Sequence, residues 1–141
     1  MTSLSECLIS GLLLGFDSFL AGLVVGPILT SWSARARLMI AFGLCDGLST
    51  VLGAVAPHFA PDLPLAMVYA LAVAVIIKAA SQSRAWLYGM PIVLSLDNLA
   101  AGRPASDAVA LALSSAAMAG LGLTLGSIGR RLAIRLAVAG A

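Results

Sequence analysis

Apolar residues form long, continuous runs along this chain, with short polar stretches between them. Five runs are long enough to cross a membrane as helices, at residues 4–29, 38–56, 65–80, 85–102 and 108–128. A sixth run, residues 132–141, has about half the length that a helical span needs. Because apolar and polar positions do not alternate, the pattern predicts helices and not strands. We therefore expect an all-α membrane protein with five full transmembrane helices and a short sixth helix.

The composition indicates the same class of protein. Of the 141 residues, 61% are hydrophobic and 10% are charged, and the mean hydropathy is +1.07. A soluble domain has about half apolar and about a quarter charged residues. We therefore expect a single transmembrane domain over residues 1–141, with the lipid bilayer as its surroundings. The net charge of +2 is too small to indicate a nucleic-acid partner.

The positions of the basic residues predict an orientation in the membrane. If the loop after the first run is cytoplasmic, seven of the eight basic residues lie inside and only Arg103 lies outside. The seven are Arg35, Arg37, Lys78, Arg84, Arg130, Arg131 and Arg135. Cytoplasmic loops are enriched in Lys and Arg, so this orientation is favoured. It puts the N-terminus and His58 outside. The first six residues lack Lys and Arg, so we expect a retained first helix and no cleaved signal peptide.

Three aspartates, Asp17, Asp46 and Asp97, lie within the apolar runs. A carboxylate in the middle of a membrane helix costs several kcal/mol unless it is paired, hydrated or bound to a cation. A protonated carboxyl that bonds one helix to another is the structural alternative. Three such residues favour a path for cations or protons.

Two of the aspartates begin the same short motif, Asp-[Ser/Asn]-x-x-Ala-Gly, at residues 17–22 and 97–102. This repetition is typical of a duplicated transporter unit, with halves at about 1–80 and 85–141 and a site where they meet. Carboxylate oxygens suit Mg²⁺, Ca²⁺ and Mn²⁺. The neighbouring Ser18 and Asn98 are predicted either to add metal ligands or to hydrogen-bond between helices.

Four stretches resemble, in order, the motifs of the MntP family of small manganese efflux pumps, which belongs to the LysE-type transporter group. They are GFDSFLA at 15–21, FGLCDGL at 42–48 with a later glycine, LSLDNLAAG at 94–102 and LGSIGRR at 125–131. The resemblance implies six helices arranged as a 3+3 inverted repeat. It also implies export of Mn²⁺ across the bacterial inner membrane. The chain departs from the family in its short sixth helix and in having Ser18 and Asn98 beside the key aspartates.

Together these observations predict a divalent cation exporter that works by alternating access, with Mn²⁺ as the first substrate to consider. Asp17 and Asp97 are the expected primary metal ligands, and Asp46 is a third ligand or a proton carrier. We expect no resident cofactor and no enzymatic activity. The alternatives are an exporter of another cation and a non-transporting membrane subunit. An intramembrane aspartyl protease is disfavoured, because Cys45 stands where the protease motif Gly-x-Gly-Asp has its second glycine.

Small residues around these motifs predict close packing between helices. They include Gly11, Gly15, Gly22, Gly26, Gly43, Gly47, Gly53, Gly120, Gly122 and Gly126. A sixth helix too short to span the bilayer would leave some of these packing faces uncovered. We therefore expect a homodimer or a complex with another membrane chain.

Overall fold

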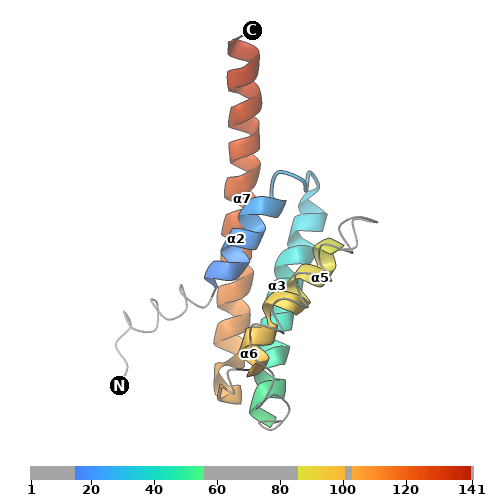
Figure 1. Cartoon of the computed structure of the whole chain (residues 1–141), viewed down its shortest axis with the longest axis vertical. Coiled ribbons are helices and arrows are strands. Elements are labelled where there is room, and N and C mark those ends of the chain that lie inside the picture. The colour runs from blue at the N-terminus through green and yellow to red at the C-terminus, as the bar shows by residue number, and fades with distance from the viewer. Residues whose placement is uncertain (1–14, 56–85, 101–102, 141) are drawn as a thin grey trace, which may run out of the picture.

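The computed structural model describes residues 15–55, 86–100 and 103–140, apart from the side chains of Asp97 and Ala100. These residues form the helices α2 (Phe16–Val25), α3 (Trp32–Val55), α5 (Trp86–Leu94), α6 (Leu96–Ala100) and α7 (Ala108–Ala139), with a 3₁₀ turn η1 (Ala105–Asp107) before α7 (Figure 1). The predicted run 65–80, the turn with His58 and the first part of the run 4–29 lie outside the described residues.

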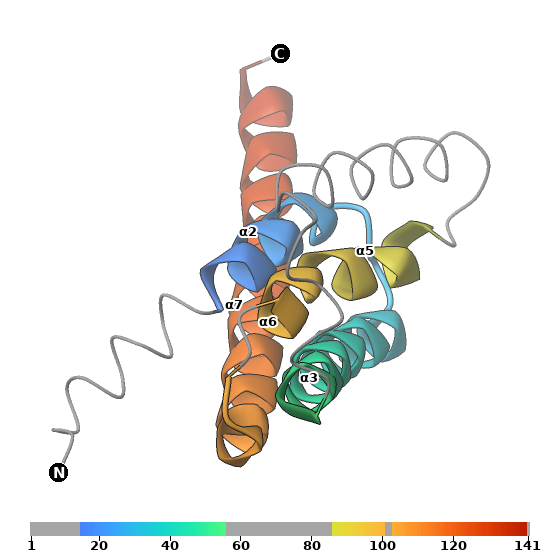
Figure 2. The same cartoon turned by 60° about the horizontal axis from the view of Figure 1, so that its bottom comes forward.

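The long helix α7 makes the most extensive contacts among the described helices. It packs along both α2 and α3, and α5 and α6 pack against α3 (Figure 2). Their shared core contains Val25 from α2, Leu38 and Phe42 from α3, Leu87 from α5 and Leu123 from α7. The core therefore draws at least one apolar side chain from each of four helices.

Glycines allow α2 and α7 to touch through their backbones. Gly22 on α2 and Gly26 at its C-terminal cap face the part of α7 that carries Gly122 and Gly126. Each pair is spaced by four residues, which places both members on one helix face. A Cβ atom on Gly22 would lie 2.5 Å from the carbonyl oxygen of Ala119. No side chain larger than hydrogen fits at this distance. The prediction of close packing is confirmed for these four glycines.

The predicted division into five spans and a short sixth helix is wrong. Residues 108–128 and 132–141 belong to one continuous helix, α7, which runs through Gly129, Arg130 and Arg131 without a break. The basic pair was interpreted as a loop, but arginine is a good helix former. One interior glycine costs only about 1 kcal/mol relative to alanine, which a helix of 32 residues tolerates.

The predicted fourth span is also wrong as a single helix. It is divided into α5, with nine residues, and α6, with five, and neither is long enough to cross a bilayer. The break lies at Ser95, whose hydroxyl donates to the carbonyl of Ile92 at 3.0 Å. Pro91 lies inside α5, one turn before the break.

The 3+3 inverted repeat is contradicted by the same elements. In such a repeat the two aspartate motifs would occupy equivalent helices. Instead Asp17 lies in the first turn of α2, a ten-residue helix, and Asp97 lies in the five-residue α6. The similarity of the two motifs is therefore local and does not extend to the helices that carry them.

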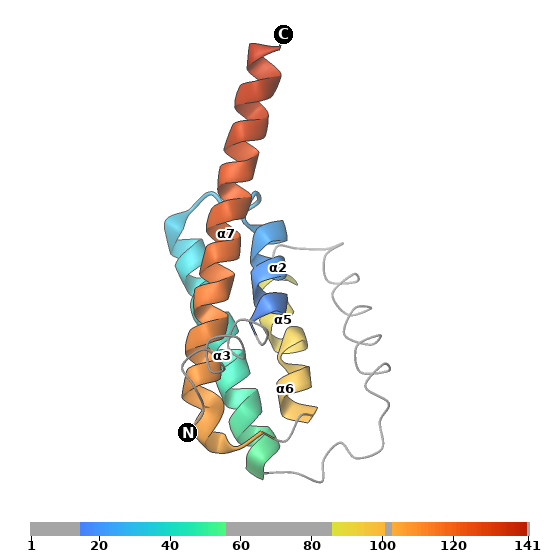
Figure 3. The ribbon, with the colours of Figure 1, turned by 90° about the vertical axis from the view of Figure 1, so that its left-hand side faces the viewer.

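Within the described ranges, two helices are long and apolar enough to cross a membrane, which supports membrane association. They are α3 and the helix that ends at Ala139. The helix α3 begins at Trp32, so most of the predicted basic loop at 31–37 is helical. Past residue 127, every described side chain of α7 is exposed, and this part extends beyond the other helices (Figures 1 and 3).

Candidate functional site

Asp46 lies on the buried face of α3. The buried positions of this helix include Leu38, Phe42, Asp46, Ser49 and Gly53, which recur every three or four residues as one helical face requires. Only 2% of Asp46 is exposed. A carboxylate thus occupies the buried face of α3, where apolar residues are expected. A charge at such a position is costly without compensation.

The two hydroxyls nearest to Asp46 in the sequence bond to its backbone. Ser49 Oγ donates to the Asp46 carbonyl at 3.0 Å, and Thr50 Oγ1 donates to the same carbonyl at 2.7 Å. Such bonds satisfy the hydroxyls within their own helix. They hold both side chains against α3, so these hydroxyls have a local structural role.

Asp17 and Ser18 lie at the start of α2, against α7. The backbone N–H of Ser18 donates to Asp17 Oδ1 at 2.7 Å, and Asp17 is half-buried. A carboxylate in the first turn is stabilised by the positive end of the helix dipole. The Ser18 hydroxyl lies 2.8 Å from the hydroxyl of Ser115 on α7, and both side chains are fully buried. This bond joins two helices, while the role of Ser18 as a metal ligand stays a prediction.

The structure brings Asp17 and Asp46 to the same part of α7. Asp46 lies between Gly43 and Gly47, which both pack against Ala112. Ser18, next to Asp17, bonds to Ser115, three residues further along α7. Three residues span about 4.5 Å of helix. The two aspartates therefore approach α7 at similar heights, from two different helices.

The second motif lies further along α3. Gly53 packs against the backbone of α6, where its Cβ atom would lie 3.3 Å from the carbonyl oxygen of Asn98 and 2.5 Å from that of Leu99. Gly53 follows Asp46 by seven residues, or about 10 Å along the helix axis. Asn98 is buried, and the side chain of Asp97 lies outside the described part of the chain. At the level of the backbone, this motif is about two turns from Asp46.

Among the described side chains, no group of three His, Cys, Asp or Glu residues lies close enough to hold a metal ion. A pocket of about 210 Å³ lies between α3 and the helices α5 and α6, and its walls include Cys45, Ser49 and Ser95. Its other lining residues are apolar. The clearest candidate in the described residues is therefore the single buried carboxylate of Asp46.

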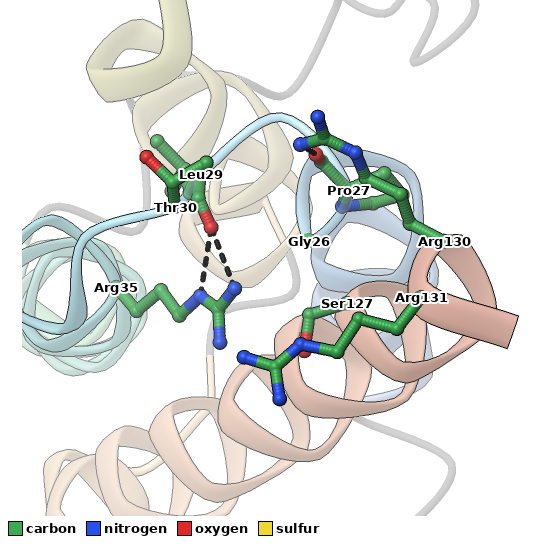
Figure 4. Close-up of a pocket in the computed structure, with 8 residues that line it drawn as sticks. All are labelled: Gly26, Pro27, Leu29, Thr30, Arg35, Ser127, Arg130 and Arg131. Carbon is green, nitrogen blue, oxygen red and sulfur yellow. Dashed lines mark hydrogen bonds between the residues drawn. The ribbon is translucent and has the colours of Figure 1, made fainter. Parts of the chain in front are cut away.

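A second polar region was missed by the sequence analysis. Arg35, Arg130 and Arg131 line one pocket at the turn between α2 and α3 (Figure 4). From the sequence, these arginines indicated only the orientation of the chain in the membrane. Their meeting depends on the unbroken course of α7, which carries Arg130 and Arg131 on the flank of a helix, where a loop had been expected.

No family model, curated protein or solved structure shows a significant match to this chain. The resemblance to the MntP family therefore stays a prediction from short motifs.

Proposed function

We propose that this chain is a membrane-embedded divalent cation exporter, with Mn²⁺ as the first substrate to test and Asp46 as its principal cation-binding residue. The proposal rests on one observation: Asp46 is almost completely buried in α3, a helix long and apolar enough to cross a membrane. Ionisable residues at such positions are costly and mark ion or proton pathways. The bacterial inner membrane, as the location, belongs to the same proposal.

Burial can be compared for two of the three candidate aspartates, Asp17 and Asp46, whose side chains the structure describes. The motif repeat favoured Asp17 and Asp97 as primary ligands and Asp46 as a third ligand. Of Asp17 and Asp46, Asp46 is the more buried, and Asp17 lies on α2 at a similar height of α7. The roles of Asp17 and Asp97 as metal ligands stay predictions. Carboxylate oxygens are suitable ligands for Mn²⁺ and for other hard divalent cations. Because the described helices do not form an inverted repeat, rocking of two equivalent halves is not part of the proposal.

The test compares Asp46→Asn with the wild type in proteoliposomes that contain a metal-sensitive dye. The amide keeps the shape and one oxygen but removes the charge that binds the cation. We expect Mn²⁺ flux to fall by about ten- to a hundredfold, which corresponds to ~1.4–3 kcal/mol. Parallel measurements with Ca²⁺, Zn²⁺ and Cd²⁺ define the preferred metal.

Asp107→Asn is the matched control, because it removes the same charge from an exposed turn outside the helix bundle. This variant should transport like the wild type. Wild-type flux in Asp46→Asn at equal protein would show that the buried carboxylate is structural. The absence of flux of any of the four metals through the wild-type protein would reject the exporter itself.

A non-transporting membrane subunit is the second candidate. It is favoured by the part of α7 beyond residue 127, where Leu132, Leu136 and Val138 are exposed past the end of the other helices. Such a surface suits another membrane chain, or a second copy of this one. Under this alternative, the purified chain moves no metal by itself, and crosslinking in native membranes captures α7 against a partner.

A further inference from the structure

The turn between α2 and α3 and the neighbouring part of α7 enclose a pocket of about 100 Å³. Three arginines line it, Arg35 from α3 and Arg130 and Arg131 from α7. The other lining residues are glycine, proline, leucine, threonine and serine, so no lining residue carries a carboxylate. The pocket therefore concentrates positive charge that its described walls do not neutralise.

Two of the arginines bond to the turn itself. Arg35 donates from Nε and Nη2 to the carbonyl of Leu29, at 2.9 and 2.6 Å. Arg130 donates from Nη1 to the carbonyl of Pro27 at 2.6 Å. Both carbonyls lie in the turn between α2 and α3, outside either helix, where a backbone carbonyl needs a donor from elsewhere. These contacts explain Arg35 and Arg130 as donors to the turn, although each guanidinium, with five N–H groups in all, keeps others for a ligand.

Arg131 needs a different explanation. In Figure 4 its guanidinium points into the pocket, toward that of Arg35, and no hydrogen bond joins it to another of the residues drawn. Two guanidinium groups directed at one space repel each other, and an anion between them removes the repulsion. The position of Arg131 therefore indicates an anion-binding site and not only a turn held by arginine side chains.

We propose that this pocket binds a phosphate group, with Arg131 and Arg35 as the main donors. The planar guanidinium matches the geometry of phosphate oxygens and bonds them in pairs. The volume is well below the ~300–1,000 Å³ of pockets that hold whole drug-sized molecules, so it suits a small anionic group. This proposal is independent of cation transport at Asp46.

Two sources can supply the phosphate, an anionic phospholipid headgroup or free phosphate. The lipid is favoured by the side chains beside the pocket, because Ile28 and Trp32 are 46% and 72% exposed. Exposed tryptophan is typical of the membrane interface, where lipid headgroups lie. Basic pockets between membrane helices bind such headgroups.

The test uses the full-length protein in dodecyl maltoside micelles and isothermal titration calorimetry. The ligands are dioctanoyl phosphatidylglycerol, zwitterionic dioctanoyl phosphatidylcholine and inorganic phosphate, each titrated separately. We expect the wild type to prefer phosphatidylglycerol to phosphatidylcholine, and Arg131→Gln to weaken phosphatidylglycerol binding about tenfold. Arg131→Lys keeps the charge but loses the paired donors, so its affinity should fall between the two.

Arg135→Gln is the matched control, because Arg135 lies one turn further along α7 and does not line the pocket. It should change affinity by less than about twofold, since an exposed charge outside the site is screened. Binding of phosphatidylglycerol but not of inorganic phosphate, with dependence on Arg131, supports the lipid source. Binding of inorganic phosphate with the same dependence supports the free anion.

Equal losses in Arg131→Gln and Arg135→Gln would overturn the proposal, because they would show a general charge effect. Equal affinity of the wild type for the two lipids, without binding of inorganic phosphate, would also overturn it. Circular dichroism of each variant verifies that the helices are retained, so a loss of affinity is assigned to the pocket and not to unfolding.

Discussion

Along α7 the contact with α2 is mainly backbone against backbone, whereas the contact with α3 is partly made by side chains. Gly122 faces α2, where a Cβ atom would meet the carbonyl oxygen of Phe19 and lie 2.8 Å from the amide nitrogen of Leu23. Gly120 is two residues away, so it points about 200° around the helix, toward Met39 of α3. Similar glycines thus serve two different kinds of contact.

The α3 side is mixed. Gly43 of α3 also meets backbone, since its Cβ atom would lie 2.6 Å from the carbonyl oxygen of Ala112. Gly47, one turn later, meets the Cβ atom of Ala112 at 3.1 Å, and Gly120 meets the methyl end of Met39. Side chains can adjust by rotation, but a backbone moves only with its whole helix. Substitutions on the two faces of α7 should therefore differ in cost.

The largest effect is expected for Gly122→Ala. The new methyl group collides with the backbone of α2, which relieves the collision only by moving away from α7 and opening the core. We expect the free energy of unfolding to fall by about 3 kcal/mol, at the upper end of overpacking effects. Thermal unfolding in detergent, followed by intrinsic fluorescence, measures the loss.

Gly129→Ala is the control for helix propensity. It makes the same substitution on the same helix, where no atom lies within 4 Å of the new Cβ atom. This variant should be as stable as the wild type or more stable by up to about 1 kcal/mol. If Gly122→Ala behaved like Gly129→Ala, the backbone contact between α2 and α7 would not exist as described.

A smaller effect is expected for the pair of hydroxyls, Ser18 and Ser115, that joins α2 to α7. Ser115→Ala leaves the fully buried hydroxyl of Ser18 without its partner on α7. A side-chain hydrogen bond between membrane helices contributes about 1 kcal/mol, so the free energy of unfolding should fall by about that amount. The double variant Ser18→Ala/Ser115→Ala should lose less than the sum of the single losses, because removing the second hydroxyl leaves no polar group unpaired.

Ser114→Ala is the control, since its hydroxyl bonds to the Leu111 carbonyl of its own helix at 3.0 Å.

Mn²⁺ flux then separates the two predicted roles of Ser18. Ser18→Ala should transport like the wild type if the hydroxyl only joins helices. A loss of flux greater than that of Ser115→Ala would identify Ser18 as a metal ligand.

The two long helices could be predicted from sequence, but their ends could not. The apolar runs 38–56 and 108–128 both fall largely within α3 and α7. Charged residues were taken as boundaries at 31–37 and at 129–131, although arginine favours a helix and its long side chain can reach a polar environment. Hydropathy reports where lipid is tolerated, and a helix does not stop where hydropathy falls.

The candidate sites show a different limit. The repeated motif made Asp17 and Asp97 the expected primary ligands, yet packing buries Asp46 more completely than Asp17. The arginine pocket joins Arg35 to Arg131, which are far apart in the sequence. No local pattern encodes such a contact. The candidate residues could therefore be named from the sequence, but the residues that they contact are set by helix packing.

The smallest effect is expected for Gly120→Ala, on the α3 face. Its new Cβ atom would lie 2.5 Å from Met39 Cε, which is the far end of a flexible side chain. Methionine rotates into other gaps at little cost, and alanine favours the helix, so stability should change by less than about 1 kcal/mol in either direction. In a Met39→Ala background the obstacle is gone, and Gly120→Ala should stabilise the protein. A loss as large as that of Gly122→Ala would mean that Met39 cannot move and that α3 is held as rigidly against α7 as α2 is.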